Sequence, residues 1–171
     1  LTPREGHLLH LAAAFGPGDG EAAIVDIGPF MGLSTGWLAA GAKRAGRGKI
    51  VACDPDGWTR DGQRQAFDDA MRRAGLGDHV EVREGPARQA VAGFALPVRL
   101  LVAGPDPESR AIPATLAAWI TRVVPGGLVA LAGAGARPLM GALAEQLNGD
   151  ASSWRLAYHI EQLAVFERIG W

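Results

Sequence analysis

Short apolar runs alternate with amphipathic stretches along most of the chain. The apolar runs are rich in β-branched residues, which is typical of buried strands, and they fall at residues 23–27, 49–54, 80–83, 98–103 and 127–132. Between them, apolar residues recur at helical spacing, which predicts helices at residues 34–45, 62–74, 109–123 and 137–147. Strands that alternate with helices in this way form a parallel sheet with helices on both faces.

The two ends of the chain depart from the alternation. At the start, Thr2 can cap a helix that has Pro3 in its first turn and Glu5 at the capping-box position. At the end, the extended runs 154–159 and 163–168 are joined by a turn too short for a parallel crossover, so they must pair antiparallel. The sequence therefore predicts an α/β fold: a three-layer, Rossmann-like open sheet, mostly parallel, that ends in an antiparallel hairpin.

Composition limits the organisation and the partners of the chain. Its 171 residues fit a single domain, residues 1–171, so cover for a substrate must come from short loops or a partner. With 17 Lys and Arg against 18 Asp and Glu, there is no basic block for nucleic acid or a membrane surface. The sequence has no signal-like segment and no apolar segment of membrane length, so we expect a soluble, cytoplasmic protein. We expect a small-molecule substrate, and the sequence does not decide whether the chain forms a homo-oligomer. The single cysteine, Cys53, lies in an apolar run and excludes a disulfide framework or a cysteine metal cluster.

A glycine turn follows the first predicted strand. Gly28 comes directly after it, and glycines there let the backbone approach a ligand closely. Ser34 or Thr35 can cap the next helix, whose N-terminal amides would face a phosphate or a carboxylate. Glycines at 28, 32 and 36 do not match the G-x-G-x-x-G pattern of dinucleotide sites. The spacing therefore predicts a nucleotide-type site without naming its ligand.

An acid ends the second predicted strand. Asp54 is an acceptor at a strand tip, where a ribose diol binds in many nucleotide sites. However, residues 54–57 read Asp-Pro-Asp-Gly, which is also ordinary turn chemistry. The residues alone leave both interpretations open.

Together these features resemble the class I S-adenosylmethionine-dependent methyltransferases, and within them the small bacterial O-methyltransferase-type domains. The resemblance covers nearly the whole chain. Each motif is weak alone, and their order carries the match. The motifs are Leu1-Thr2-Pro3-Arg4-Glu5-Gly6, Val25-Asp26-Ile27-Gly28, Gly32-Leu33-Ser34-Thr35, Val51-Ala52-Cys53-Asp54-Pro55, Val82-Arg83-Glu84-Gly85-Pro86, Pro125-Gly126-Gly127-Leu128-Val129-Ala130-Leu131 and Leu163-Ala164-Val165-Phe166-Glu167-Arg168.

The resemblance implies S-adenosyl-L-methionine as cofactor and a role for each end of it. Asp26 would orient the ammonium group beside the glycine turn, Asp54 would bind the ribose hydroxyls, and the segment after the third strand would meet the edge of the adenine. The cofactor-binding residues so implied are Asp26, Gly28, Pro29, Phe30, Gly32, Ser34, Thr35, Asp54, Pro55, Gly85, Pro86, Ala87 and Ala103. Phe30 would be either a lid over the cofactor or a core aromatic.

The chain departs from metal-dependent relatives, which hold a divalent cation with acids after the fourth and fifth strands. Here Ala103, Pro105 and Gly133 occupy those positions, and only Asp106 and Glu108 remain nearby, as part of a solvated loop. Three hard oxygen ligands are the least that a dedicated Mg²⁺ or Ca²⁺ site requires. We therefore predict no metal site.

The sequence assigns no catalytic base. Histidine is the side chain most often used as a general base, and the chain has His7, His10, His79 and His159, but none of them has a clear catalytic position. His7 and His10 lie on the first helix, His79 precedes the third strand, and His159 is expected at a strand end on the surface. Trp58, just after Asp54, would line a substrate opening or pack as an exposed aromatic on Pro55.

The leading hypothesis is a metal-independent methyltransferase that O-methylates a small hydroxylated metabolite or a sugar-containing product. Positioning and exclusion of water can supply much of the acceleration of such an in-line transfer. One alternative is a noncatalytic relative that keeps the cofactor site as a binding or scaffold subunit. The other is an NAD-dependent oxidoreductase, since Asp54 would also suit an adenine ribose.

Overall fold

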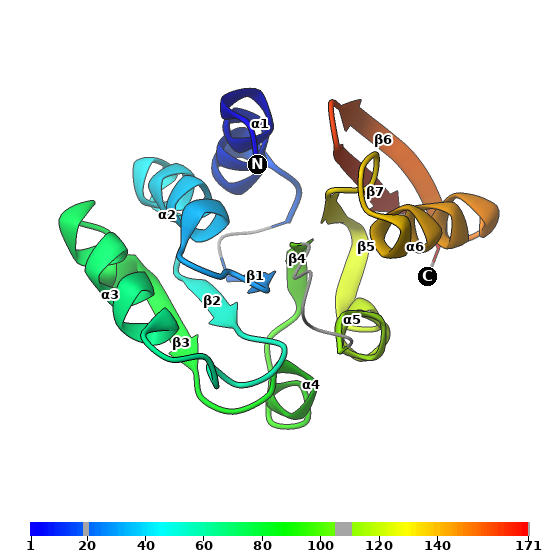
Figure 1. Cartoon of the computed structure of the whole chain (residues 1–171). Helices are drawn as coiled ribbons and strands as arrows, with labels where there is room; N and C mark the ends of the chain where they lie inside the picture. Colours follow the sequence, from blue (N-terminus) through cyan, green and yellow to red (C-terminus); the bar gives the residue numbers. More distant parts are fainter. Residues whose placement is uncertain (19–20, 105–110, 171) are drawn as a thin grey trace.

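A computed structural model describes residues 1–18, 21–104 and 111–170, and these ranges contain a seven-stranded sheet of order β3-β2-β1-β4-β5-β7-β6 (Figure 1). The strands are β1 (Ala23–Ile27), β2 (Ile50–Cys53), β3 (Val80–Arg83), β4 (Val98–Ala103), β5 (Val123–Ala132), β6 (Trp154–Ile160) and β7 (Leu163–Arg168). Neighbours from β3 to β5 pair in parallel, whereas β7 pairs antiparallel with both β5 and β6. The predicted sheet with its terminal hairpin is confirmed.

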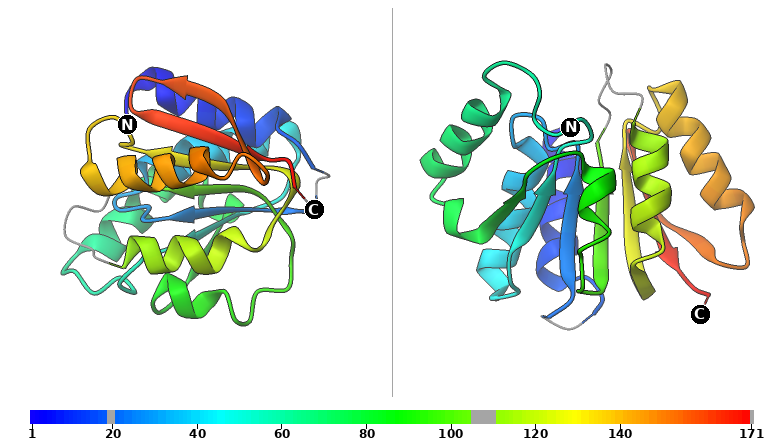
Figure 2. Two further views of the ribbon diagram at one scale, coloured as in Figure 1. Left: turned by 90° about the vertical axis from the view of Figure 1, so that its right-hand side faces the viewer. Right: turned by 90° about the horizontal axis from the view of Figure 1, so that it is seen from below.

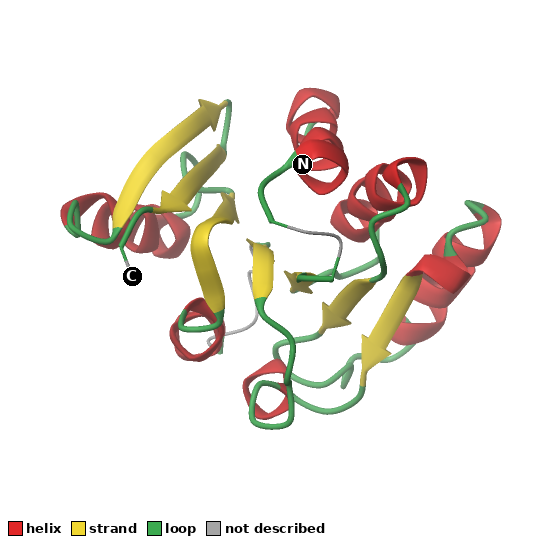
Figure 3. Ribbon diagram, turned by 180° about the vertical axis from the view of Figure 1, so that it is seen from behind, coloured by secondary structure: helices red, strands yellow, loops and turns green. Residues whose placement is uncertain are grey.

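Helices cover both faces of the sheet, as Figure 2 shows from two further directions and Figure 3 from behind. The first group is α1 (Pro3–Phe15), α2 (Leu33–Ala45) and α3 (Gln63–Arg73), and the second is α4 (Ala87–Ala90), α5 (Ile112–Ile120) and α6 (Pro138–Gly149). Each group buries its apolar side chains in a separate core cluster, one on either face of the sheet. A helical turn over Gly77–His79 leads into β3.

The first helix begins as its sequence predicts. The Thr2 side chain accepts from the backbone of Glu5, while the Thr2 amide donates to Glu5 Oε2 at 2.7 Å. Glu5 is buried, and its other oxygen accepts from the Gln162 amide at 2.8 Å. Because Gln162 lies in the turn between β6 and β7, Glu5 fixes the start of α1 beside the carboxyl end of the sheet.

Two predicted boundaries are wrong. The helix predicted at 109–123 is described only from Ile112 and ends at Ile120, and Val123 already belongs to β5, where it pairs with Val98. The early start of β5 goes with a register irregularity between Val98 and Leu100, which the apolar pattern does not reveal. The short helix α4 was also not predicted, because a single turn has no periodicity to read. Within the described residues, no helix is both long and apolar enough to span a membrane.

Candidate functional site

The first strand carries a buried acid with one free oxygen. Asp26 is fully buried, and its Oδ2 accepts hydrogen bonds from Ser34 Oγ at 2.8 Å and Thr35 Oγ1 at 2.6 Å. Among the described residues, nothing forms a hydrogen bond with its buried Oδ1. Burial raises the pKa of the Asp26 carboxyl from its ordinary value of 3.8 to about 6, against the two hydrogen bonds that lower it. A cationic donor that reached Oδ1 would satisfy both the orphan oxygen and the buried charge.

The prediction that Ser34 or Thr35 caps the second helix is wrong. The capping residue of α2 is Gly32, and it makes no side-chain cap. The helix starts at Leu33, so both hydroxyls lie within its first turn, and they donate to Asp26 instead. The reason is that a buried carboxylate needs donors, and these two hydroxyls are the ones that the turn brings to it.

The glycine turn has the conformation that a close ligand approach requires. Gly28 and Gly32 have φ values of 74° and 91°, which side chains rarely tolerate. Pro29 between them is buried, whereas Phe30 is 51% exposed and has a φ of 51°, a strained conformation for a bulky residue. Phe30 is therefore not a core aromatic. An exposed, strained aromatic over a glycine turn is a candidate cover for a ligand.

The second strand ends in an acid that its own loop already binds. Asp54 is buried, and its Oδ1 accepts from the backbone amides of Asp56 at 2.9 Å and Trp58 at 3.1 Å. Its Oδ2 accepts from Gln63 Nε2 at 2.8 Å. The turn interpretation of Asp54 therefore describes the geometry correctly. The ribose role is not excluded by it, because Oδ2 retains capacity for a further donor.

The predicted adenine segment lies against the same loop. The Ala87 amide donates to the Asp54 carbonyl at 2.8 Å, and the Trp119 indole donates to the Ala87 carbonyl at 2.8 Å. Gly85 and Pro86 lie just before Ala87 and are half-buried. The start of α4 is thus bonded directly to the tip of β2, which brings Ala87 beside Asp54.

Trp58 occupies neither of its two predicted positions. It is only 9% exposed, its ring packs edge-on against Phe67 with centroids 5.0 Å apart, and its indole nitrogen donates to the Arg83 carbonyl at 3.1 Å. Trp58 therefore connects the loop after β2 with α3 and with the end of β3, and it is buried instead of lining an opening. A spacing argument could not place it, because Phe67 and Arg83 reach it only through the fold.

The predicted residues converge at one edge of the sheet. Asp26 pairs in register with Ala52, so the tips of β1 and β2 are adjacent, and the Gly28 amide donates to the Cys53 carbonyl at 3.1 Å. A Cβ added to Gly28 would lie 3.8 Å from Pro55 and 3.4 Å from the Gly104 carbonyl oxygen. The site is therefore a narrow seam between the β1, β2 and β4 tips, and the buried Ala103 lies in the last of these.

Sequence reasoning missed Gln63 and Arg60. Gln63 is 4% exposed and bonds Asp54, and the Arg60 guanidinium lies 6.0 Å from the centre of the Phe30 ring. A glutamine at a helix start and an arginine in a loop are ordinary surface residues in a sequence. The only available signal was their place shortly after the acid at the strand tip.

The candidate bases lie on other elements than the two acids. His7 and His10 stack on α1 with ring centroids 6.1 Å apart, His79 precedes β3, and His159 is exposed on β6 as predicted. Asp106, with Pro105 and Glu108, lies outside the described residues. Within the described part of the chain, no group of three or more His, Cys, Asp or Glu side chains could hold a metal ion. Cys53 is buried, as predicted.

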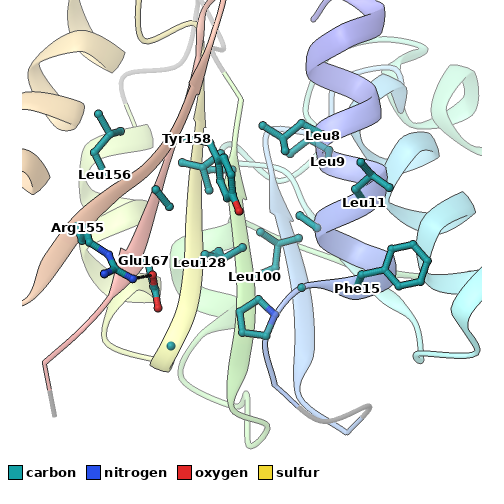
Figure 4. A pocket seen from close by; sticks show the side chains of 17 residues that line it. Leu8, Leu9, Leu11, Phe15, Leu100, Leu128, Arg155, Leu156, Tyr158 and Glu167 are labelled. Carbon is teal, nitrogen blue, oxygen red and sulfur yellow. Dashed lines mark hydrogen bonds and ion pairs between the residues drawn. The ribbon is translucent and has the colours of Figure 1, made fainter.

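A separate groove of about 650 Å³ opens between α1 and the terminal hairpin (Figure 4). Leu8, Leu11 and Phe15 line it from α1, and Leu156 and Tyr158 line it from β6, as the figure shows. None of the predicted cofactor residues contributes to it. The groove is therefore a different feature from the seam at the strand tips.

Comparisons with known proteins find the same fold in other chains. Solved structures with the same arrangement include the cofactor-bound Rv0187 from MTB, at 21% identity and a TM-score of 0.74, with 99% of this chain and 82% of that chain covered. The O-methyltransferase from Bacillus cereus in complex with SAH has 18% identity and a TM-score of 0.73, with the same coverage of 99% and 82%. The O-methyltransferase TomG from Streptomyces achromogenes, in complex with SAM, has 20% identity and a TM-score of 0.72, again covering 99% and 82%.

These likenesses establish the fold. The comparison with curated proteins gave no match. A family model described as "Methyltransferase domain" matches residues 25–131, which is more than half of the chain and includes both acids and the glycine turn. The chain therefore belongs to the methyltransferase-domain family and has the class I fold of S-adenosylmethionine-dependent methyltransferases.

Proposed function

We propose that the seam binds S-adenosylmethionine and that the protein transfers its methyl group to a hydroxyl of a small metabolite or a sugar-containing product, without a metal ion. The observation that carries this proposal is the pair of buried acids at adjacent strand tips, each with acceptor capacity left over. The family match to a methyltransferase domain supports it. The family match gives no support to the alternative of an NAD-dependent oxidoreductase.

The residues present fit this cofactor at both of its polar ends. The unpaired Oδ1 of Asp26 is suited to an ammonium group, and Gly28 and Gly32 have no side chain that would keep a ligand from the backbone. Asp54 Oδ2 is suited to a ribose hydroxyl, and residues 85–87 lie where an adenine would continue. When bound, the cofactor supplies an electrophilic methyl group on a sulfonium. The chain itself binds the donor, orients it and excludes water from it.

Metal independence rests on the residues at the relevant strand tips. Ala103 ends β4, and Gly133 follows β5, so neither tip offers a carboxylate at these positions. Transfer from a sulfonium needs alignment of donor and acceptor more than it needs a Lewis acid. Methyl transfer in the presence of excess EDTA should therefore match the rate without it. An EDTA-sensitive rate that Mg²⁺ restores would contradict this part of the proposal.

Calorimetric titration with S-adenosylmethionine and S-adenosylhomocysteine tests the cofactor assignment. We expect saturable binding to the wild-type protein and its loss in Asp54→Ala. A screen of phenols, catechols and sugar-containing acceptors with a methyl-labelled donor then tests the substrate class. Absence of binding by the folded wild-type protein would overturn the proposal as a whole.

One observation favours a noncatalytic relative as a second candidate. Asp54 makes three hydrogen bonds within the protein, so its carboxylate has a structural role that does not need a ligand. A scaffold that kept the fold but lost catalysis would retain these contacts. Binding without methyl transfer to any acceptor in the screen would support this candidate, and transfer that Asp54→Ala abolishes would exclude it.

A further inference from the structure

The Asp54 loop and the start of α3 form one preorganised unit around a glutamine. The Trp58 amide donates to Asp54 Oδ1, the Trp58 ring packs on Phe67, and Gln63 donates to Asp54 Oδ2. Gln63 is the first residue of α3, after Gly62, whose φ of 71° turns the chain into the helix. The backbone around Gln63 is therefore held by the Asp54 loop before it and by α3 after it, and its amide is bonded to Asp54.

Only one oxygen of Asp54 can serve a ligand. Oδ1 already accepts two backbone amides, which uses its two lone pairs. Oδ2 accepts one donor, from Gln63, and has room for one more. A ribose has two neighbouring hydroxyls, so Asp54 alone cannot accept from both of them in this conformation.

Gln63 supplies the missing acceptor. A carboxylate only accepts, so the amide must present its nitrogen to Asp54 and its oxygen away from it. Gln63 Oε1 is buried and has no hydrogen-bond partner within the part of the chain that the structure describes. Because nitrogen and oxygen belong to the same planar amide, this unpaired Oε1 lies next to Asp54 Oδ2. A buried acceptor without a partner costs about 1 to 3 kcal/mol, which a ligand hydroxyl would recover.

We propose that Gln63 Oε1 and Asp54 Oδ2 together accept the two ribose hydroxyls of the cofactor, so that Gln63 makes the site selective for ribonucleosides over deoxyribonucleosides. This inference rests on the proposed function, since it assigns a ribose to Asp54. It adds a residue that binds the ligand directly and that the sequence did not indicate.

Calorimetry with S-adenosylhomocysteine and with its 2′-deoxy and 3′-deoxy analogues tests the inference. The wild-type protein should bind each deoxy analogue about 5- to 100-fold more weakly, because each leaves one buried acceptor unpaired. Gln63→Met keeps the length of the side chain but removes the amide. This variant should bind S-adenosylhomocysteine about 10-fold more weakly and should lose its preference over one of the two analogues.

The same helix offers a matched control. Gln65 is exposed, and its amide bonds only the exposed face of α3, at Asp69 Oδ1. Gln65→Met should therefore bind all three ligands as the wild type does. If Gln63→Met discriminates between the ligands as strongly as the wild type, this inference is overturned and the proposed function stands. If the wild type binds none of the ligands, both are overturned.

A measurement on the wild-type protein keeps the test independent of how the variant folds. The side-chain amide resonance of Gln63, followed by ¹H–¹⁵N NMR, should shift on addition of S-adenosylhomocysteine. It should shift less with the analogue that lacks the hydroxyl that Gln63 accepts. An unmoved Gln63 amide at saturating S-adenosylhomocysteine would overturn the inference.

Discussion

The tips of β1 and β2 both carry a buried aspartate, but the two acids have different surroundings. Asp26 receives two side-chain hydrogen bonds, both on one oxygen, and burial raises its pKa to about 6. Asp54 receives three hydrogen bonds shared over both oxygens. Both carboxylates are buried, but only Asp26 has an oxygen that no donor reaches among the described residues. The β1 tip holds an incompletely paired charge that a cation would stabilise, whereas the charge at the β2 tip is already bonded on both oxygens and has room for one further donor on Oδ2.

This difference predicts separate roles for the two tips. A ligand at Asp26 would relieve an existing electrostatic penalty, so mutation there should change binding and pH dependence more than folding. Asp54 supports the loop that leads to α3, so mutation there should reduce both stability and binding. The following experiments are ordered from the largest expected effect to the smallest.

The largest effect is expected at Asp54. Asp54→Ala leaves the amides of Asp56 and Trp58 and the Gln63 side chain without their acceptor. We expect a loss of about 2 to 4 kcal/mol in the free energy of unfolding, measured in urea, because hydrogen bonds to a charged group are each worth about 1.5 to 3 kcal/mol. Binding of S-adenosylhomocysteine should weaken by more than about 100-fold.

A conservative change separates the two roles of Asp54. Asp54→Asn retains an oxygen for the loop amides but presents an NH₂ group to the NH₂ group of Gln63. It should lose less stability than Asp54→Ala while binding almost as weakly. Equal stability of all three proteins would contradict the structural role of the β2 tip.

Asp26 should show the opposite balance. Because its folded pKa of about 6 lies above the ordinary value of 3.8, the folded state keeps a proton that the unfolded state has lost. The contribution of the Asp26 carboxyl to the free energy of unfolding is therefore fully present below about pH 4. It is lost as the pH rises through about 6, which lowers stability by on the order of 2 to 3 kcal/mol. Asp26→Asn should abolish this fall, so the variant should be more stable than the wild type at pH 7.

The same variant should bind less well. Loss of a charge-assisted hydrogen bond to the ammonium group should weaken S-adenosylhomocysteine binding about 10- to 100-fold at pH 7. In the wild type, affinity should fall about tenfold for each pH unit below 6, since binding requires the ionised carboxyl. Calorimetry between pH 5 and 8 measures both. If the affinity of the wild type does not depend on pH, Asp26 does not bind the ammonium group of the cofactor through its ionised carboxylate.

A smaller effect is expected at the glycine turn. Gly32→Ala places a Cβ at a φ of 91°, 2.7 Å from Met71 Cε, and should reduce the free energy of unfolding by about 1 to 2 kcal/mol. Gly46→Ala is the control: Gly46 ends the same helix with a φ of 65° and nothing within 4 Å of the added Cβ. Both variants should lose stability, but only Gly32→Ala should weaken cofactor binding. If Gly32→Ala and Gly46→Ala bind the cofactor equally well, the glycine turn has no role in cofactor binding.

The smallest effect concerns Phe30. Its ring is 51% exposed, so Phe30→Ala should leave the midpoint of thermal unfolding nearly unchanged. If the ring covers the bound cofactor, S-adenosylhomocysteine should bind about 2- to 5-fold more weakly through lost apolar contact. Phe30→Gly should behave similarly and gain slightly in stability, because it relieves the φ of 51°. Unchanged affinity for S-adenosylhomocysteine in both variants would exclude a role of the Phe30 ring as a cover for the cofactor.

Much of the fold could be predicted because hydrophobic periodicity is a local property. The strand at 23–27 and the two hairpin strands at 154–160 and 163–168 needed no knowledge of their neighbours. Boundaries were less predictable: Val123 reads as the end of a helix and pairs as a strand with Val98. Pairing across the sheet decides such residues, and a window of sequence contains no pairing partner.

At the site, the sequence indicated the residue types but not their partners. Asp26 stands out because it lies between two apolar residues of a strand, where an acid is rarely buried, and Asp54 because it directly follows an apolar run. By contrast, Ser34 was expected at a cap and instead bonds Asp26, and Trp58 was expected at the surface and is buried. Hydrogen-bond partners depend on which segments the fold brings together, and each of these contacts joins separate elements.

The sequence by itself therefore determined the order of strands and helices, the closing hairpin and the two acids at the edge of the sheet, because these follow from local patterning. Only the tertiary structure decided that Asp54 binds its own loop with Oδ1 and Gln63 with Oδ2, and that Asp26 Oδ1 and Gln63 Oε1 are buried acceptors without a partner among the described residues. The reason is physical: an unpaired buried atom is defined by every group around it, and those groups come from distant parts of the chain.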